Sequence, residues 1–197
     1  MLHRPRRLVF TAAALCLLAA CTPTSPTPTP SPAPSYRCTP EAGGDEFDCT
    51  QAQHDEMIAK DRLYAEAEAV YRKFFAEEVR ILRAGGTATV TPTLEETTTG
   101  AFLADVMEYY LSLRSDKATL VGGEVRLATL VRVPGVSKAG SVIAMRACSD
   151  ASSARIVIDG KDTGPGRRGS DLLYFIRVDG ALKIEGADGK EVSSCDQ

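Results

Sequence analysis

The chain has 197 residues and a formal net charge of −3; 44% of its residues are hydrophobic, and tryptophan is absent. A net acidic chain whose folded part contains no basic run is poorly suited to bind nucleic acid, so that class of partner is excluded. About 160 residues follow the two N-terminal segments described next, enough for one domain with its own core.

The first 20 residues have the three parts of a secretory signal: a charged start, an apolar run and a small-residue end. Three arginines supply the charge, residues 8–20 are apolar apart from one threonine, and Leu-Ala-Ala precedes Cys21. This order resembles a bacterial lipoprotein signal, which implies cleavage before Cys21 and a diacylglycerol on its sulfur. The apolar run of about 13 residues is shorter than the roughly 20 that a spanning helix needs. We therefore predict a lipid-anchored protein on the extracytoplasmic face of the cell membrane. The alternative is an ordinary secretory signal in which Cys21 is a simple thiol.

Residues 21–36 form a predicted tether, because residues 22–35 read TPTSPTPTPSPAPS and contain six of the 11 prolines of the chain. Proline fixes its own φ angle and removes a backbone donor, which excludes a helix or a central strand. A polyproline-II spacer rises about 3.1 Å per residue and would extend about 40 Å here. We expect this tether to hold the folded domain away from the membrane.

Four cysteines remain once Cys21 is assigned to the lipid and Cys16 is lost with the signal. An even number of cysteines in an exported domain indicates disulfides, and four cysteines allow three connectivities. We expect one bond to clasp the segment 37–50 and the other to hold the C-terminus: Cys38–Cys49 and Cys148–Cys195. Metal binding is the alternative, but there is no CxxC pair and His54 is the one histidine of the folded part, so we expect no metal and no other cofactor.

Two helices are predicted in the first half of the domain. Thr50 and Gln53 form a capping box for a long helix over 51–84, which the pair Gly85-Gly86 would end. A loop with one helical turn at 93–98 and a second helix over 101–115 follow. The apolar stripe of the long helix, which needs a large partner surface, comprises Met57, Tyr64, Ala67, Tyr71, Phe74 or Phe75, Val79 and Leu82.

From residue 118 onward the pattern changes to the alternation that is typical of β-strands. Strands are expected near 118–133, 140–149, 153–160, 171–179 and 181–186, between turns that contain glycine. Asp179-Gly180 is the clearest hairpin signal, and Arg167-Arg168 is expected at an exposed loop tip. Helices that precede an antiparallel meander indicate an α+β domain over 51–197, with a curved sheet around the long helix.

One stretch resembles a known family. A strand that ends in Cys148-Ser149-Asp150, a polar turn with Ser152, the strand residues 156–158 and the turn Asp159-Gly160-Lys161 are similar to small exported actinobacterial lipoproteins with a nuclear transport factor 2-like domain. A distal cysteine, here Cys195, often accompanies this pattern. The chain departs from it at Ala181-Leu182, where such proteins often have tryptophan. The resemblance implies a cone of antiparallel sheet closed by N-terminal helices, a fold shared by isomerases, hydrolases, dehydratases and many proteins that are not enzymes.

Few residues offer catalytic chemistry. Asp105 and Tyr109 lie four residues apart and share one helix face, which makes them weak candidates for a base and a proton donor in the cavity. Asp150 is a third weak candidate, although aspartate at such a position commonly accepts hydrogen bonds from turn amides, here those of Ser152 and Ser153. His54 is expected at the surface, and no nucleotide, zinc or calcium motif is present.

The combination of a tether, a cavity-forming fold and no catalytic motif predicts a non-enzymatic domain. We expect it to bind a small apolar ligand or a partner protein of the cell envelope. Two alternatives stay open: a structural or assembly role through the outer face of the sheet, and a small hydrolase or isomerase that uses the cavity.

Overall fold

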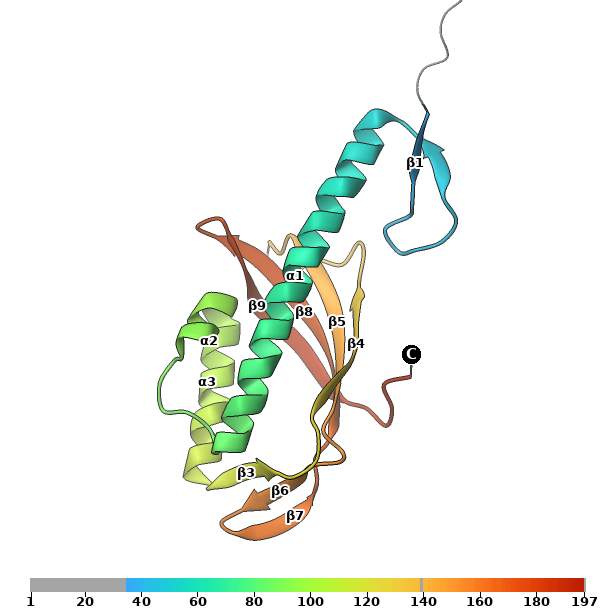
Figure 1. Ribbon diagram of the computed structural model, residues 1–197. Helices are drawn as coiled ribbons and strands as arrows, with labels where there is room; N and C mark the ends of the chain where they lie inside the picture. Colours follow the sequence, from blue (N-terminus) through green and yellow to red (C-terminus); the bar gives the residue numbers. More distant parts are fainter. Residues whose placement is uncertain (1–34, 139, 197) are drawn as a thin grey trace, which may run out of the picture. The chain divides into compact units, whose positions relative to one another are not determined.

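The computed structural model describes residues 35–196 except residue 139, so the predicted signal, Cys21 and the tether up to residue 34 lie outside the described residues. The described chain combines helices with antiparallel sheets, which confirms the α+β class. Figure 1 shows the long helix α1 (Gln51–Ala84) crossing one face of a four-stranded sheet, with the shorter helices α2 (Pro92–Thr97) and α3 (Gly100–Ser115) beside it.

A small hairpin precedes α1. Its strands β1 (Tyr36–Cys38) and β2 (Phe47–Cys49) pair antiparallel, and the predicted Cys38–Cys49 disulfide closes it. The hairpin loop is attached to α1 through Glu41, which accepts hydrogen bonds from Lys60 Nζ at 2.9 Å and from the Tyr64 hydroxyl at 2.6 Å. The disulfide was expected but the two strands were not, because three residues are too few to show an alternating pattern.

Helix α1 begins and ends where the sequence predicts. The Thr50 side chain accepts a hydrogen bond from the Gln53 amide, and the Gln53 side chain accepts one from the Thr50 amide, which completes the capping box. Its 34 residues rise about 1.5 Å each and give a length of about 51 Å. The N-terminal turns of α1 therefore extend beyond the four-stranded sheet (Figure 1).

The strands form two main sheets where one curved sheet was expected. A three-stranded sheet has the order β3-β6-β7, and a four-stranded sheet has the order β4-β5-β8-β9. The predicted strand over 118–133 is divided because Gly122 and Gly123 both have positive φ, and the two halves join different sheets. The strand bounds are β3 (Ala118–Val121), β4 (Arg126–Arg132), β5 (Ile143–Asp150), β6 (Arg155–Ile158), β7 (Lys161–Pro165), β8 (Arg168–Val178) and β9 (Ala181–Glu191).

Two further strand predictions need correction. Strand β7 lies where the sequence indicated only a turn; it is an edge strand, and Pro165 is tolerated there because an edge needs no second set of ladder bonds. Arg168 is not at a loop tip but begins β8. By contrast, the predicted Asp179-Gly180 hairpin is confirmed: both residues have positive φ, as a two-residue type I′ turn requires, and they join β8 directly to β9.

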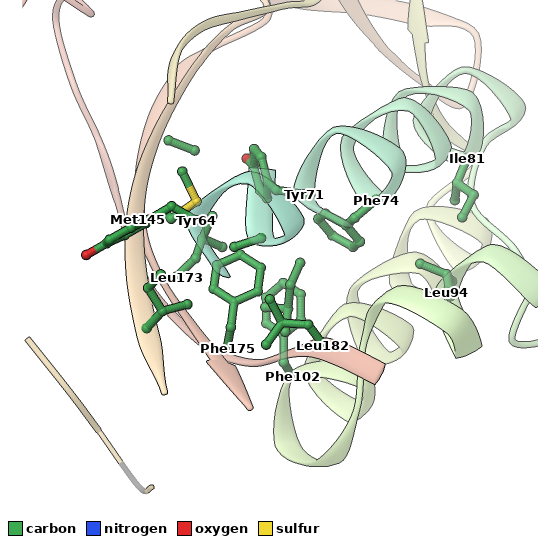
Figure 2. Close-up of a cluster of buried hydrophobic side chains, with 14 of the residues drawn as sticks. Tyr64, Tyr71, Phe74, Ile81, Leu94, Phe102, Met145, Leu173, Phe175 and Leu182 are labelled. Atoms are coloured by element: carbon green, nitrogen blue, oxygen red, sulfur yellow. The ribbon is translucent and has the colours of Figure 1, made fainter. Parts of the chain in front are cut away.

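The hydrophobic core lies between α1, α3 and the four-stranded sheet. Figure 2 shows Tyr71 and Phe74 of α1 on one side and Leu173 and Phe175 of β8 on the other, with Phe102 of α3 among them. Each of these five side chains is buried. The apolar stripe of α1 thus finds its partner surface in the sheet, and this packing defines an inner face for both.

A second disulfide, between Cys148 in β5 and Cys195, ties the C-terminal segment to a strand in the middle of the four-stranded sheet. Both bonds have the pairing that the sequence predicts. Two disulfides indicate an oxidising, extracytoplasmic environment. Within residues 35–196, no helix is both long and apolar enough to cross a membrane.

Candidate functional site

An acidic residue occupies a core position on α1. The buried residues Tyr71, Phe74 and Ile81 recur at helical spacing along the inner face. Glu78 lies seven residues after Tyr71 and four after Phe74, so it belongs to the same face. It is only partly exposed. A glutamate thus interrupts the apolar stripe at the point where α1 packs on the rest of the domain.

Strand β8 contributes a second carboxylate to this inner face. Side chains two residues apart on a strand lie on the same side, and Asp171 precedes the buried core residues Leu173 and Phe175 at this spacing. Its cross-strand neighbour is Gly189 of β9, where a Cβ atom would lie only 2.5 Å from Asp171 Oδ1. The glycine therefore leaves the space that the Asp171 carboxylate occupies.

Two tyrosines complete what we call the interior cluster, which consists of Tyr71, Glu78, Tyr110 and Asp171. Tyr71 of α1 is 2% exposed and Tyr110 of α3 is fully buried. The Tyr110 hydroxyl is a buried polar atom for which the described residues provide no hydrogen-bond partner. An unpaired buried hydroxyl is costly, and the Tyr110 hydroxyl is free to bond to a group from outside the described chain.

The electrostatics of the interior cluster follow from burial without a counter-charge. Burial raises the pKa of Glu78 to about 7, and the negative charge of Asp171 adds to the shift. Burial also raises the pKa of Asp171, and burial followed by the charge of Glu78 raises the pKa of Tyr71 and of Tyr110. In the described part of the chain neither carboxylate has a hydrogen bond or an ion pair. The cluster can therefore exchange a proton near neutral pH, and it attracts positive charge.

A pocket of about 410 Å³ is lined by sequence neighbours of this cluster, although the four cluster residues themselves are not in its walls. Leu82, which is one helical turn after Glu78, lines it, and so does Tyr109, whose ring centroid lies 5.8 Å from that of Tyr110. We call it the Tyr109 pocket. Its other walls come from α3, β3, β6 and the segment before β8, and they are mainly apolar: Leu113, Ala118, Leu120 and Ile156, with Arg167 at the polar side.

The predicted acid–base candidates Asp105 and Tyr109 both lie on α3, and both are exposed. Asp105 is not among the groups that shift the pKa of the Tyr109 phenol. Tyr109 is 49% exposed and lines the pocket; burial and the charge of Glu78 raise the pKa of its phenol. Tyr109 is therefore a pocket residue. Glu78, and not Asp105, is the carboxylate whose charge raises the pKa of its phenol.

Asp150 has the structural role that the sequence favoured. The carboxylate is 7% exposed and accepts hydrogen bonds from the Ser152 amide at 2.9 Å and the Ser152 hydroxyl at 2.6 Å. Arg168 and Arg126 lie 3.0 and 3.1 Å away. The hydrogen bonds from Ser152 and the two guanidinium groups hold the pKa of Asp150 well below its usual range. Ser153 does not contact Asp150 but bonds to Glu124. A carboxylate that is saturated in this way is a poor base.

The residues between 35 and 196 contain no group of three or more potential metal ligands. His54 packs near the Tyr36 ring, with 5.2 Å between the ring centroids.

Glu78 and Asp171 were not among the residues predicted from the sequence. The available signal was the phase of α1, because Glu78 falls in the row that runs from Phe74 to Ile81, whereas the predicted stripe continued through Val79 and Leu82.

A scan against protein-family models and a search among curated proteins found no match to this chain. The interior cluster and the Tyr109 pocket are therefore the features that indicate a function.

Proposed function

We propose that this protein is a lipid-anchored extracytoplasmic domain that binds a small, largely apolar ligand in the Tyr109 pocket. The pocket itself is the observation that carries the proposal: its volume of about 410 Å³ lies within the range of about 300–1,000 Å³ that small-molecule sites occupy. Apolar walls and a few polar groups are the composition that such sites share.

The proposed fold type is nuclear transport factor 2-like. Helices that precede an antiparallel sheet, and a long helix packed on the inner face of that sheet, support this assignment. The pocket between helices and strands is also what a cavity-forming fold of this type would offer. The assignment adds a reason to expect a ligand, but fold alone does not determine function.

The lipid anchor has a direct test. We expect the mature chain to begin at Cys21 and to carry a diacylglycerol on its sulfur, so that the protein remains with the membrane fraction after a high-salt wash. Mass spectrometry of the N-terminal peptide measures this. A secreted chain with an unmodified N-terminus, and an unchanged distribution after Cys21→Ser, would show that the anchor is wrong.

Ligand occupancy is tested on protein extracted from its natural membrane with a mild detergent. We expect native mass spectrometry to detect an apolar small molecule that leaves when the protein is denatured. Leu113→Trp, which fills the pocket, should abolish this mass. Leu111→Trp is the matched control, because Leu111 lies on the same helix and is 48% exposed. A chain without any bound molecule that instead copurifies with one stoichiometric protein would favour the partner-protein alternative.

The enzyme alternative is supported by a specific observation, which is the pKa of Glu78 near 7. A carboxylate that titrates at working pH is suited to act as a general base, and the Tyr110 hydroxyl could donate to a substrate oxygen. The candidate pair of an isomerase or hydrolase is thus Glu78 and Tyr110 rather than Asp105 and Tyr109. Chemical change of the bound molecule during incubation, lost in Glu78→Gln, would distinguish this alternative from binding alone.

A further inference from the structure

We propose that the interior cluster binds the ammonium group of a small amphiphilic amine, whose apolar part occupies the Tyr109 pocket. This inference rests on the proposed ligand-binding function and specifies the chemical class of the ligand. The two carboxylates, the unpaired Tyr110 hydroxyl and the position of the pocket support it.

The charge of the interior cluster favours a cationic ligand. Glu78 and Asp171 face the same interior from α1 and β8, and no cation of the described chain pairs with either. Three phenols also act on this region: Tyr71, Tyr109 and Tyr110. Two further charged groups act on these phenols, and each is already paired: Glu77 with Arg80, and Arg167, which lines the pocket, with Glu191. The charge of Asp171 adds to the rise in the pKa of Glu78, and a ligand cation would favour the ionised form of both partly buried carboxylates.

The hydrogen-bonding groups of the interior cluster match an ammonium group. An ammonium group carries three donors and no acceptor. Glu78 and Asp171 offer carboxylate acceptors, and the Tyr110 hydroxyl is buried without a partner. A hydroxyl oxygen can accept a hydrogen bond as well as donate one. One ammonium group could therefore satisfy three polar groups for which the described chain provides no partner.

The aromatic and apolar surroundings of the interior cluster favour an amphiphilic amine. The aromatic rings of Tyr71 and Tyr110 belong to the cluster, and rings of this kind attract a cation over their faces. The apolar pocket begins at Leu82, one turn from Glu78, and at Tyr109, next to Tyr110. A compound with a charged nitrogen at one end and a short hydrocarbon chain matches this order of polar and apolar surfaces. A compound with an anionic head would instead meet the two carboxylates.

Binding should depend on pH in a defined direction. Glu78 releases its proton near pH 7 in the free protein, and a bound ammonium favours the ionised carboxylate. The affinity should therefore rise with pH and change about tenfold between pH 6 and pH 8. An aliphatic amine with a lysine-like pKa stays protonated over this range, so that the change reports on the protein.

The experiment compares hexylamine, 1-hexanol and hexanoate by isothermal titration at pH 8. The protein is the chain from Thr22 to Gln197, which contains every described element and both disulfides. We expect hexylamine to bind at least tenfold more tightly than 1-hexanol, and hexanoate to bind most weakly. Glu78→Gln and Asp171→Asn should each remove most of the preference for the amine. Glu108→Gln is the control, since it makes the same chemical change at an exposed position of α3 and should leave all three affinities unchanged.

Equal binding of hexylamine and 1-hexanol, with both lost in Leu113→Trp, would overturn the amine proposal while supporting the pocket. Failure of all three compounds to bind would also overturn it, and the molecule that copurifies with the natural protein would then decide the proposed function separately. Retention of the amine preference in both Glu78→Gln and Asp171→Asn would show that the ammonium group lies elsewhere, which contradicts the proposal.

Discussion

Replacement of Glu78 with glutamine is expected to stabilise the folded domain by about 2–3 kcal/mol at pH 8. The pKa of Glu78 is raised from 4.5 to about 7 in the folded protein. Between these two pH values the unfolded chain loses the Glu78 proton while the folded chain keeps it, so the stability of the wild-type protein falls as the pH rises. Above pH 7 the penalty is complete, and glutamine removes it. A gain in stability on removing a charge is unusual for a surface residue and is typical of a site held in readiness for a ligand.

Urea unfolding at pH 4 and at pH 8 measures this effect. At pH 4, which is below both pKa values, Glu78 is mostly protonated in the folded and in the unfolded wild-type protein. The free energy of unfolding of Glu78→Gln should therefore be close to that of the wild-type protein. At pH 8 the variant should have the higher free energy of unfolding. Glu108→Gln, at an exposed position, should behave like the wild-type protein at both pH values. A Glu78→Gln variant that is less stable at pH 8 would mean that the carboxylate makes a favourable contact.

Removal of the Cys148–Cys195 disulfide by a double change to alanine is expected to lower the free energy of unfolding by about 4 kcal/mol. The bond joins residues 47 apart in sequence, and the chain-entropy model gives a loss of this size for a closed loop of that length. It also holds the C-terminal segment, beyond the last strand, against β5. Thermal and urea unfolding under oxidising conditions measure the change.

The Cys38–Cys49 disulfide provides the comparison. It closes a hairpin that packs on the N-terminal half of α1 and contributes no residue to the core cluster. Glu41 in the hairpin loop accepts a hydrogen bond from Tyr64, a core residue of α1. Its removal should leave global unfolding within about 1 kcal/mol of the wild-type value, since the hairpin can open alone. Limited proteolysis near residues 39–46 should become faster. Equal losses for the two double variants would mean that the clasp and the core unfold as one unit.

The helices and the α+β class could be predicted because their signals are local. The capping box at Thr50 and Gln53 and the Asp179-Gly180 turn act through neighbouring residues, and the structure has them as the sequence indicates. The division of the strands into two sheets could not be predicted in this way. It depends on which segments pair, and β3 joins β6 across more than 30 residues while β4 joins β5.

The candidate site was harder to predict for the same physical reason. Asp105 and Tyr109 are predicted as an acid–base pair because they share a helix face, but periodicity does not show which face of the helix the sheet covers. Glu78 lies on the covered face of α1, in the row of Phe74 and Ile81. The charge of Asp171, almost 100 residues later in the sequence, adds to the rise in its pKa. Two carboxylates from distant segments become a site only when the fold brings them to one interior.

The titration of Glu78 reports whether the interior cluster holds a carboxylate that a bound cation can ionise. Carboxyl carbon NMR of the chain from Thr22 to Gln197, with the Glu78 signal assigned by its loss in Glu78→Gln, follows this one group from pH 3 to pH 9. We expect a midpoint near pH 7 in the free protein and a lower midpoint in the presence of hexylamine. A midpoint near the ordinary glutamate value of about 4.3, unchanged by the amine, would contradict this expectation.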